Sequence, residues 1–202
     1  MYCFCYITLK IDETNTDIRK GLGVYDYIQG ILEKIKHAGI FYGLSFTVSR
    51  TNFDTLTDEL FMNKLITSGC QLFFFVDYIP VKEGTEDNVI TDEQRSALAI
   101  ILDSYRSKFP SLFVSFPGDE EAFGGCLSAG QGFIHISAEG DLEPCPFAPY
   151  SDTNLNNSSL KEALKSELFN KIRQNRAELS ETNGGCALWK KRYWVESLIK
   201  SE

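Results

Sequence analysis

The chain has 202 residues, which is room for one medium domain or two small ones. A full (β/α)₈ barrel alone needs about 250 residues, so only a shortened or partial barrel would fit. The composition, with 43% hydrophobic and 24% charged residues, excludes disorder as the main state. A net charge of -8 repels phosphate backbones, so we expect no nucleic-acid partner.

The first part of the chain alternates predicted strands with predicted helices. We expect strands where apolar residues follow one another, and helices where they recur every three or four positions. The expected order is strand 2–11, helix 24–38, strand 44–48, helix 57–69, strand 71–79, helix 91–108 and strand 112–116. The helix residues expected to face inward are Ile28, Ile31, Leu32, Ile35, Leu60, Phe61, Leu65, Ile66, Leu98, Ile101 and Tyr105. This order is typical of a parallel sheet joined by βαβ crossovers, and therefore of an α/β fold.

The pattern changes after residue 117. Residues 133–137 and 142–146 predict a β-hairpin joined by a tight turn. Helices are predicted to begin at Ser159 and to cover residues 188–200. The first of these two helices is expected to bury Leu160, Leu164, Leu168 and Ile172. The acidic run at residues 119–121 is expected on the solvated surface. We therefore expect two domains, residues 1–117 and residues 118–202.

The N-terminal apolar run at residues 2–9 does not have the features of a targeting segment. It has no basic segment before it and is followed by Lys10 and Asp12, so we expect neither a signal peptide nor a membrane span. Six cysteines in a chain of this length are too few for a disulfide scaffold. We therefore expect a cytoplasmic protein whose thiols stay free unless they bind a metal.

Three of the six cysteines lie in turns rich in glycine or proline. Cys126 and Cys186 each follow two glycines, and Cys145 lies between two prolines. Such turns let a thiolate face a metal and leave backbone N–H groups free for the sulfurs of a cluster. The other three cysteines, at positions 3, 5 and 70, lie in apolar stretches, where a structural role is the usual one. We predict that the first three are metal ligands.

The C-terminal part resembles the auxiliary-cluster domain of radical SAM enzymes, which is called SPASM in its full form and twitch in its shorter form. The resemblance rests on GCLSAG at residues 125–130, the hairpin at 134–141, PCPF at 144–147, SLKE at 159–162 and GCAL at 185–188. It implies that Cys126, Cys145 and Cys186 hold an auxiliary four-iron four-sulfur cluster. With three cysteine ligands the domain is nearer the twitch form, and the fourth iron position is open to substrate, water or a non-cysteine ligand.

The N-terminal part resembles the middle of a radical SAM barrel. The resemblance rests on ITLK at residues 7–10, TDIRKG at 16–21, GLSFTV at 43–48 and YIP at 78–80. It implies that residues 1–117 form the C-terminal half of a partial β/α barrel with three βα units, and that residues 118–202 form a small α+β cluster-binding domain. It places Thr8, Arg19, Ser45 and Asn52 where a complete homologue contacts S-adenosylmethionine; an ordinary structural role at strand ends and in loops is the alternative.

Radical SAM chemistry also requires a first cluster, held by the motif Cys-x-x-x-Cys-x-x-Cys. The sequence contains no such triplet. The fourth-strand site is altered as well, with Thr8, Lys10 and Ile11 where the family prefers Ser, an acid and Gly. We therefore expect a truncated, cluster-binding C-terminal portion of a radical SAM/SPASM enzyme that acts on a peptide or protein. It is not expected to bind S-adenosylmethionine or to be catalytic alone, and no catalytic residue is assigned.

Two other interpretations stay open at this point. The chain could be an accessory subunit that pairs with a separately encoded N-terminal barrel half, because a half barrel leaves unpaired strand edges. It could also be a zinc-stabilised structural domain, since tetrahedral thiolate sites suit zinc. The candidates for a fourth zinc ligand are Cys70, His37 and His135, and none of them lies in a ligand motif.

Overall fold

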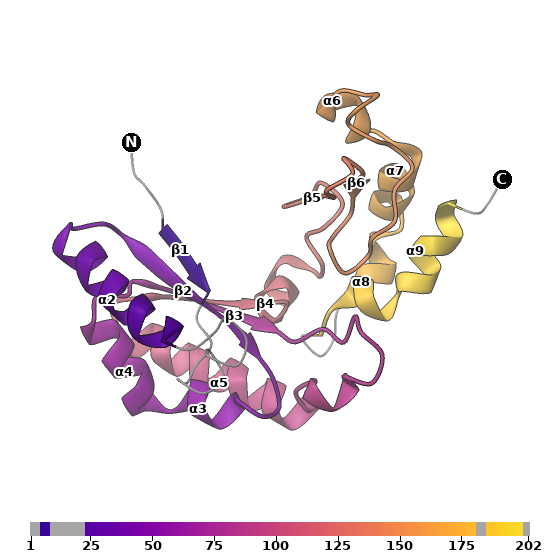
Figure 1. Cartoon of the computed structure of the whole chain (residues 1–202). Helices are drawn as coiled ribbons and strands as arrows, with labels where there is room; N and C mark the ends of the chain where they lie inside the picture. The colour runs from indigo at the N-terminus through magenta and orange to yellow at the C-terminus, as the bar shows by residue number, and fades with distance from the viewer. Residues whose placement is uncertain (1–4, 9–22, 181–184, 200–202) are drawn as a thin grey trace. The chain divides into compact units, whose positions relative to one another are not determined.

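A computed structural model describes residues 5–8, 23–180 and 185–199 of the chain (Figure 1). The described residues fall into two compact units, residues 1–118 and residues 119–202. Each unit has its own hydrophobic core. The two units are therefore described separately.

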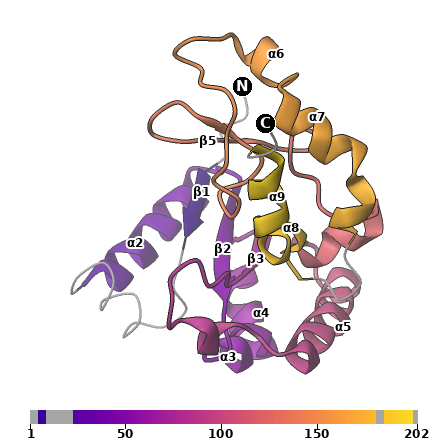
Figure 2. The same cartoon turned by 90° about the vertical axis from the view of Figure 1, so that its right-hand side faces the viewer.

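The first unit is built on a four-stranded parallel sheet. Its strands are β1 (Cys5–Thr8), β2 (Tyr42–Val48), β3 (Leu72–Asp77) and β4 (Leu112–Phe116). They lie side by side in chain order, and Figure 2 shows β1, β2 and β3 of this series. Helices in the intervening segments are α2 (Val24–His37), α3 (Phe53–Thr57), α4 (Glu59–Thr67) and α5 (Asp92–Lys108), and a short 3₁₀ helix, η1, covers Glu86–Asn88. The parallel order confirms the predicted α/β fold of this part of the chain.

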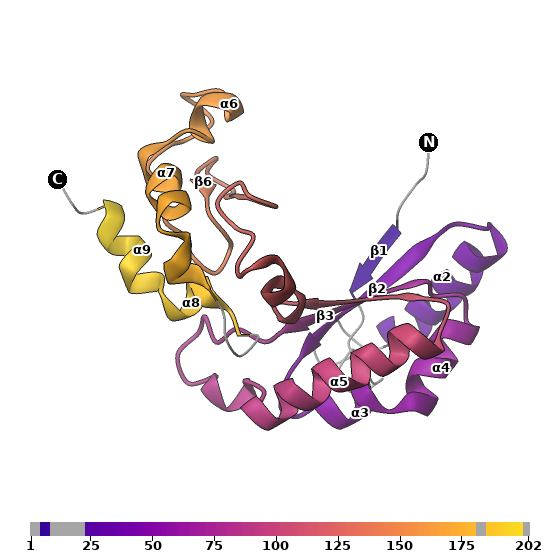
Figure 3. The ribbon, with the colours of Figure 1, turned by 180° about the vertical axis from the view of Figure 1, so that it is seen from behind.

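The core of this unit lies between one face of the sheet and the helices. Leu44 of β2 pairs with Phe73 of β3, and Phe73 pairs with Phe113 of β4, so these side chains share a face. The ring centroids of Phe73 and Phe113 are 5.1 Å apart in a stacked arrangement. Residues of all four helices pack into the same cluster, and Figure 3 shows α3, α4 and α5 together on one side of the sheet. The opposite face carries the stacked pair Phe74 and Phe116, which is only partly buried.

Helix starts in the first unit follow the capping signals of the sequence. The Thr91 hydroxyl accepts a hydrogen bond from the backbone N–H of Gln94, and the Gln94 side chain accepts one from the N–H of Thr91. This reciprocal pair fixes the predicted start of α5. Asp58 caps α4 in the same way by accepting from the N–H of Phe61. The N-terminal strand was predicted at residues 2–11, of which residues 2–4 and 9–11 lie outside the described residues.

Two expectations about α4 and its surroundings are wrong. Leu60 was expected to face the core, but it is 80% exposed, and Met62 is buried instead. The reason is that α3 ends at Thr57 and α4 begins afresh after Asp58, so the buried face is set by the new helix start. The separate helix α3, which buries Phe53 and Leu56, was not predicted.

The carboxyl end of β3 holds a buried ion pair. Asp77 Oδ2 accepts a hydrogen bond from Arg95 Nε at 3.2 Å, and the Asp77 side chain is only 5% exposed. Arg95 also donates to Asp92 at 2.8 Å, so it joins β3 to the first turn of α5. Burial raises the pKa of Asp77 to about 6 and outweighs the opposing attraction of Arg95.

The raised pKa of Asp77 predicts how stability depends on pH. Between about pH 4 and pH 6 the folded chain keeps a proton that the unfolded chain has lost, so the free energy of unfolding falls as the pH rises, by up to about 3 kcal/mol. Asp77→Asn keeps an acceptor for Arg95 without the charge, and it should flatten this decline in urea unfolding curves measured from pH 4 to pH 7. The matched control is Asp103→Asn, because Asp103 pairs with Arg106 at the exposed surface of α5. An equal decline in wild type and Asp77→Asn would contradict the prediction.

The second unit is small and has little regular structure. It has a two-stranded antiparallel hairpin, β5 (His135–Ile136) and β6 (Leu142–Glu143). Its helices are α6 (Leu160–Ala163), α7 (Glu167–Gln174), α8 (Ala187–Lys190) and α9 (Arg192–Ile199). The 3₁₀ helices are η2 (Gly118–Phe123) and η3 (Arg176–Leu179). The hairpin confirms the predicted one, although its paired strands are shorter than expected.

Both C-terminal helices are divided where the sequence analysis expected continuous ones. The first divides because Ser166 caps α7 by accepting from the N–H of Phe169. This also changes the face, since Leu160 is 45% exposed rather than buried. The second divides at Lys191, which lies between the end of α8 at Lys190 and the start of α9 at Arg192. The predicted start at Ser159 is confirmed, since Ser159 and Glu162 form a capping box.

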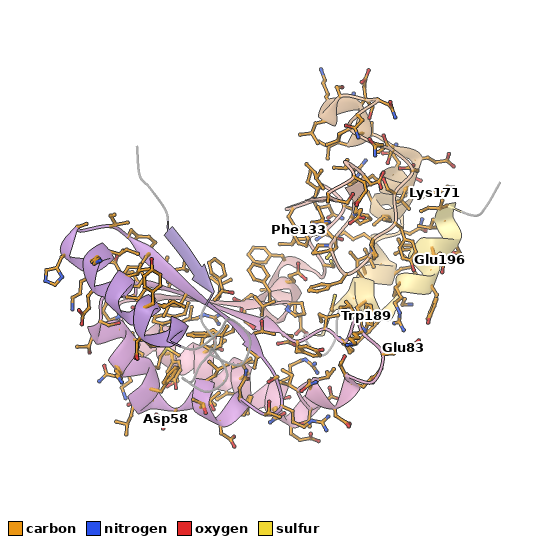
Figure 4. All side chains as sticks on the ribbon, viewed as in Figure 1. Asp58, Glu83, Phe133, Lys171, Trp189 and Glu196 are labelled. Atoms are coloured by element: carbon orange, nitrogen blue, oxygen red, sulfur yellow. The ribbon has the colours of Figure 1, made fainter. Side chains whose placement is uncertain are left out.

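Two basic side chains of this unit, Arg192 and Lys171, make contacts within it. Arg192 lies over two rings, with its guanidinium carbon 4.2 Å from the Trp189 centroid and 4.6 Å from that of Tyr193. Lys171, labelled with Trp189 in Figure 4, donates to the backbone oxygen of Leu198 at 3.0 Å and so joins α7 to α9. Arg192 and Lys171 therefore have structural partners.

None of the helices in the described ranges combines the length and the apolar character that a membrane crossing requires.

Candidate metal centre

The three cysteines predicted as ligands meet in the core of the second unit. Cys126 and Cys145 are each 4% exposed, and Cys186 is half-buried and packs against the same apolar cluster. The other members of this cluster with little or no exposure include Leu142, Ala148, Leu168, Phe169, Ile172, Leu179 and Leu188. Three thiols from segments far apart in the sequence thus lie in or against the same apolar core.

The Cys126 thiol is placed by a loop that only glycine can form. Gly125 has a φ of 107°, and a Cβ at this position would lie 2.5 Å from the backbone oxygen of Leu179. The N–H of Gly125 donates to the backbone oxygen of Glu120 at 3.0 Å, and the N–H of Cys126 donates to that of Leu179 at 3.2 Å. These bonds fix the loop between η2 and the end of η3.

The other two thiols are held by turns. The N–H of Ala129 donates to the backbone oxygen of Pro144 at 3.2 Å, which ties the Cys126 loop to the residue before Cys145. Cys145 itself begins a turn, in which the N–H of Ala148 donates to the backbone oxygen of Cys145 at 2.9 Å. Cys186 is the residue before α8, and its backbone oxygen accepts from Lys190 at 3.1 Å.

The acidity of two of these thiols is lowered mainly by burial. Burial raises the pKa of Cys145 to about 12, and the nearby Cys126, Glu120 and Glu143 also raise it, while the backbone of Phe147 lowers it. Burial likewise raises the pKa of Cys186, and the charges of Cys145, Cys126 and Glu120 act in the same direction. Cys145 and Cys186 are therefore neutral at pH 7 without a cation, and binding a cation to them must release protons.

Two polar groups lie in this core beside the thiols. Ser128 is fully buried, and its Oγ has no hydrogen-bond partner. Glu120 is 5% exposed, and its Oε1 accepts from the N–H of Leu127 at 3.1 Å. Glu120 was expected on the solvated surface with the rest of the acidic run, and the structure shows that expectation to be wrong. Its position just before the Gly-Gly-Cys loop was the available signal.

The donor set fits an iron-sulfur cluster. The residues that fit are two buried thiols and the half-buried thiol of Cys186, a glycine cradle at Gly125 that a Cβ would fill, and the unpartnered hydroxyl of Ser128. Among the described residues, no three His, Cys, Asp or Glu side chains are spaced for one metal ion. Thiolates about 2.3 Å from one tetrahedral zinc lie about 3.8 Å from each other. A cluster is larger, because it interposes iron and sulfide between its thiolates, so its thiolates need not be that close to each other.

The residues named as contacts of S-adenosylmethionine lie in the first unit. Thr8 ends β1 and pairs with Ser45 in the middle of β2, so these two lie side by side. Ser45 is 5% exposed. The Asn52 side chain accepts from the N–H of Ser49 at 2.8 Å and donates to the oxygen of Thr47 at 2.9 Å, so it closes the turn after β2. Arg19 lies outside the described residues.

The residues named as a fourth zinc ligand have other partners. Cys70 is buried in the first unit, where its Sγ donates to the oxygen of Leu72 at 3.3 Å. His37 bonds the backbone of Glu33 within α2. His135 pairs with Glu143 across the β5–β6 hairpin, with 2.7 Å between Nδ1 and Oε2.

Comparison with protein families identifies the second unit. Residues 126–187, which begin at the first of the three thiols and end just after the third, match the family model SPASM, described as an iron-sulfur cluster-binding domain. These residues are a SPASM domain. The match confirms the predicted family and iron-sulfur character of this part of the chain. A search of curated proteins finds no match.

Solved structures show where the SPASM domain and the parallel sheet occur together. SuiB from Streptococcus suis is 15% identical, with a TM-score of 0.63 over 85% of this chain and 45% of SuiB. Native anSMEcpe with bound AdoMet is 11% identical, with a TM-score of 0.61 over 98% of this chain and 68% of anSMEcpe. Its complex with the Kp18Cys peptide gives a TM-score of 0.58 at 12% identity, over 98% of this chain and 68% of that one. The fold is therefore that of part of a radical SAM/SPASM protein, and this chain spans about half the length of SuiB.

Proposed function

We propose that Cys126, Cys145 and Cys186 bind an auxiliary four-iron four-sulfur cluster, and that the chain is the cluster-binding part of a radical SAM/SPASM enzyme that modifies a peptide or protein. The observation that carries the proposal is the convergence of these three thiols in or against the apolar core of the SPASM domain. The peptide in the anSMEcpe structure supports the substrate class.

The residues of the domain have separable tasks in this proposal. The three thiols hold the cluster, and the apolar residues around them exclude water. When bound, such a cluster supplies one-electron transfer or an anchoring position, at a potential set by burial and by hydrogen bonds to its sulfurs. The Ser128 hydroxyl is buried beside the Cys126 loop and has a proton to donate. The free thiols also suit a reducing, cytoplasmic location.

We also propose that the first unit does not perform radical SAM chemistry by itself. The sequence lacks the Cys-x-x-x-Cys-x-x-Cys motif of the first cluster. AdoMet is bound in the SuiB and anSMEcpe structures. In this chain Thr8 and Ser45 are adjacent on β1 and β2, and we propose that they form one side of such a site. The remainder of that site would come from further polypeptide.

Anaerobic reconstitution with iron and sulfide tests the cluster. We expect about four iron and four sulfide per chain, with the charge-transfer absorbance of thiolate-bound iron. The triple variant Cys126→Ser, Cys145→Ser, Cys186→Ser should lose both. Cys70→Ser is the matched control, because Cys70 is a free buried cysteine of the other unit and should leave the iron content unchanged.

The same assay distinguishes zinc. A chain that takes up one zinc per molecule and no iron would contradict the proposal and support the zinc-stabilised interpretation. Iron that survives in the triple variant would also contradict it, because the metal would then lie elsewhere.

A role as an accessory subunit is the second candidate. It is favoured by the face of the sheet opposite the helices, where Phe74 and Phe116 stack and are only partly buried. We propose that a separately encoded barrel half covers this face. The DNA upstream of the Met1 codon tests this proposal. A separate reading frame with the first-cluster motif supports it, and the same motif in the same frame contradicts it.

A further inference from the structure

A buried carboxylate lies beside the three thiols. Glu120 is 5% exposed, although it comes from the short 3₁₀ helix η2 in the middle of an acidic run. Its neighbour Glu121 is exposed, as is Phe123 at the end of η2. The turn therefore directs one acid inward. Glu120 precedes the residues that match the SPASM family, so the match assigns it no role.

Glu120 is bonded to the Cys126 loop on both sides of the cysteine. Its backbone oxygen accepts from the N–H of Gly125 at 3.0 Å, and its carboxylate Oε1 accepts from the N–H of Leu127 at 3.1 Å. Cys126 stands between these two donors in the chain. The carboxyl group is thus held in a fixed place next to the first thiol.

Glu120 is also close to the other two thiols. Its negative charge raises the pKa of both Cys145 and Cys186. The geometry agrees, because the Cys126 loop that Glu120 holds is tied to the residue before Cys145 by the bond from the N–H of Ala129 to the oxygen of Pro144 at 3.2 Å, and all three cysteines pack in or against one apolar cluster. The carboxylate and the three thiols therefore share a single region of the core.

The chemistry of these four groups suits iron. A carboxylate is also an established iron ligand, alongside thiolate and imidazole. Three cysteines leave one iron of a four-iron cluster without a protein ligand.

We propose that the Glu120 carboxylate is the fourth protein ligand of the cluster and occupies the position that the three cysteines leave free. This inference rests on the proposed function. It makes the site complete within residues 119–202 and distinguishes it from a site that is open to substrate or water. One lone pair of a carboxylate oxygen forms the bond to iron, and no electron transfer is involved.

The test asks whether the fourth iron accepts an added ligand. Wild type, Glu120→Gln, Glu120→Cys and Glu121→Gln are reconstituted to equal iron content, reduced with dithionite, and examined by electron paramagnetic resonance with and without cyanide. Glu120→Gln keeps an oxygen that accepts from Leu127 but removes the anionic ligand. Glu121→Gln is the matched control, since Glu121 is the exposed neighbour.

We expect the spectra of wild type and Glu121→Gln to be unchanged by cyanide and that of Glu120→Gln to shift. Mild oxidation should also convert Glu120→Gln to the three-iron form several-fold faster than wild type. Glu120→Cys should resist cyanide again and show a spectrum different from that of wild type, because a thiolate replaces an oxygen ligand.

Other results overturn the inference. If Glu120→Gln resists cyanide as wild type does, or if Ser128→Ala opens the site while Glu120→Gln does not, the ligand is not Glu120. If Glu120→Gln fails to fold, Glu120→Cys decides, since an unchanged spectrum in that variant shows that position 120 is not a ligand. A wild-type chain that assembles no cluster overturns the proposed function and this inference together, whereas a normal cluster that is indifferent to Glu120 overturns only the inference.

Discussion

Replacing Phe73 with alanine is expected to cost about 3–5 kcal/mol of unfolding free energy in the first unit. Phe73 is fully buried in the middle of β3, stacked 5.1 Å from Phe113 and 6.3 Å from Phe46. Its removal loses apolar burial and leaves a cavity between the sheet and its helices, where a rigid sheet limits collapse. A loss of this size is a large share of the stability of an ordinary domain.

Urea unfolding followed by far-ultraviolet circular dichroism measures this loss. Phe123→Ala is the control, because it makes the same substitution at a side chain that is 65% exposed, and it should change stability by no more than about 0.5 kcal/mol. Equal losses in the two variants would show that Phe73 does not have the packing described here.

Gly125→Ala is expected to disrupt the second unit and abolish cluster assembly. The new Cβ would lie 2.5 Å from the oxygen of Leu179 and 3.0 Å from the Cα of Ser180. Both are backbone atoms, which cannot move without distorting the chain around them. The φ of 107° adds strain of about 1–3 kcal/mol for any other residue. The loop must therefore shift, and Cys126 would shift with it.

Gly124→Ala distinguishes the effect of backbone strain from that of the steric clash. Gly124 has a φ of 80°, but a Cβ there meets only the end of the Arg176 side chain at 3.9 Å, so this variant carries strain without a backbone clash. It should lower the melting temperature modestly and still take up iron. Normal iron content in Gly125→Ala, measured after reconstitution, would show that the loop tolerates a side chain and would contradict the prediction.

Most of the fold could be predicted because local signals and tertiary structure agree. The helix α5 has a capping box at Thr91 and an apolar stripe, and both are visible in the sequence. The orientation of Leu60 could not be predicted in the same way, because it depends on where α3 ends and α4 begins. Periodicity indicates that a helix has an inner face, but the helix start decides which residues lie on it.

The candidate site was predictable only in part. The thiols at Cys126, Cys145 and Cys186 have sequence signals, because glycine and proline turns flank them. For Glu120 the only signal is its position just before the Gly-Gly-Cys loop, and the acidic run around it predicts a solvated side chain instead. In the structure Glu120 is 5% exposed and bonded to Gly125 and Leu127, and this placement cannot be read from the acidic run.

The position of the thiols at the apolar core has a consequence for how much of the protein survives in a cell. Because the proposed ligands belong to the core that holds residues 119–202 together or pack against it, cluster binding would add directly to the folding free energy of that unit. When iron is scarce, more molecules would open this unit and become substrates for proteases. The amount of intact protein should then follow the iron supply even while its gene is expressed at a constant rate.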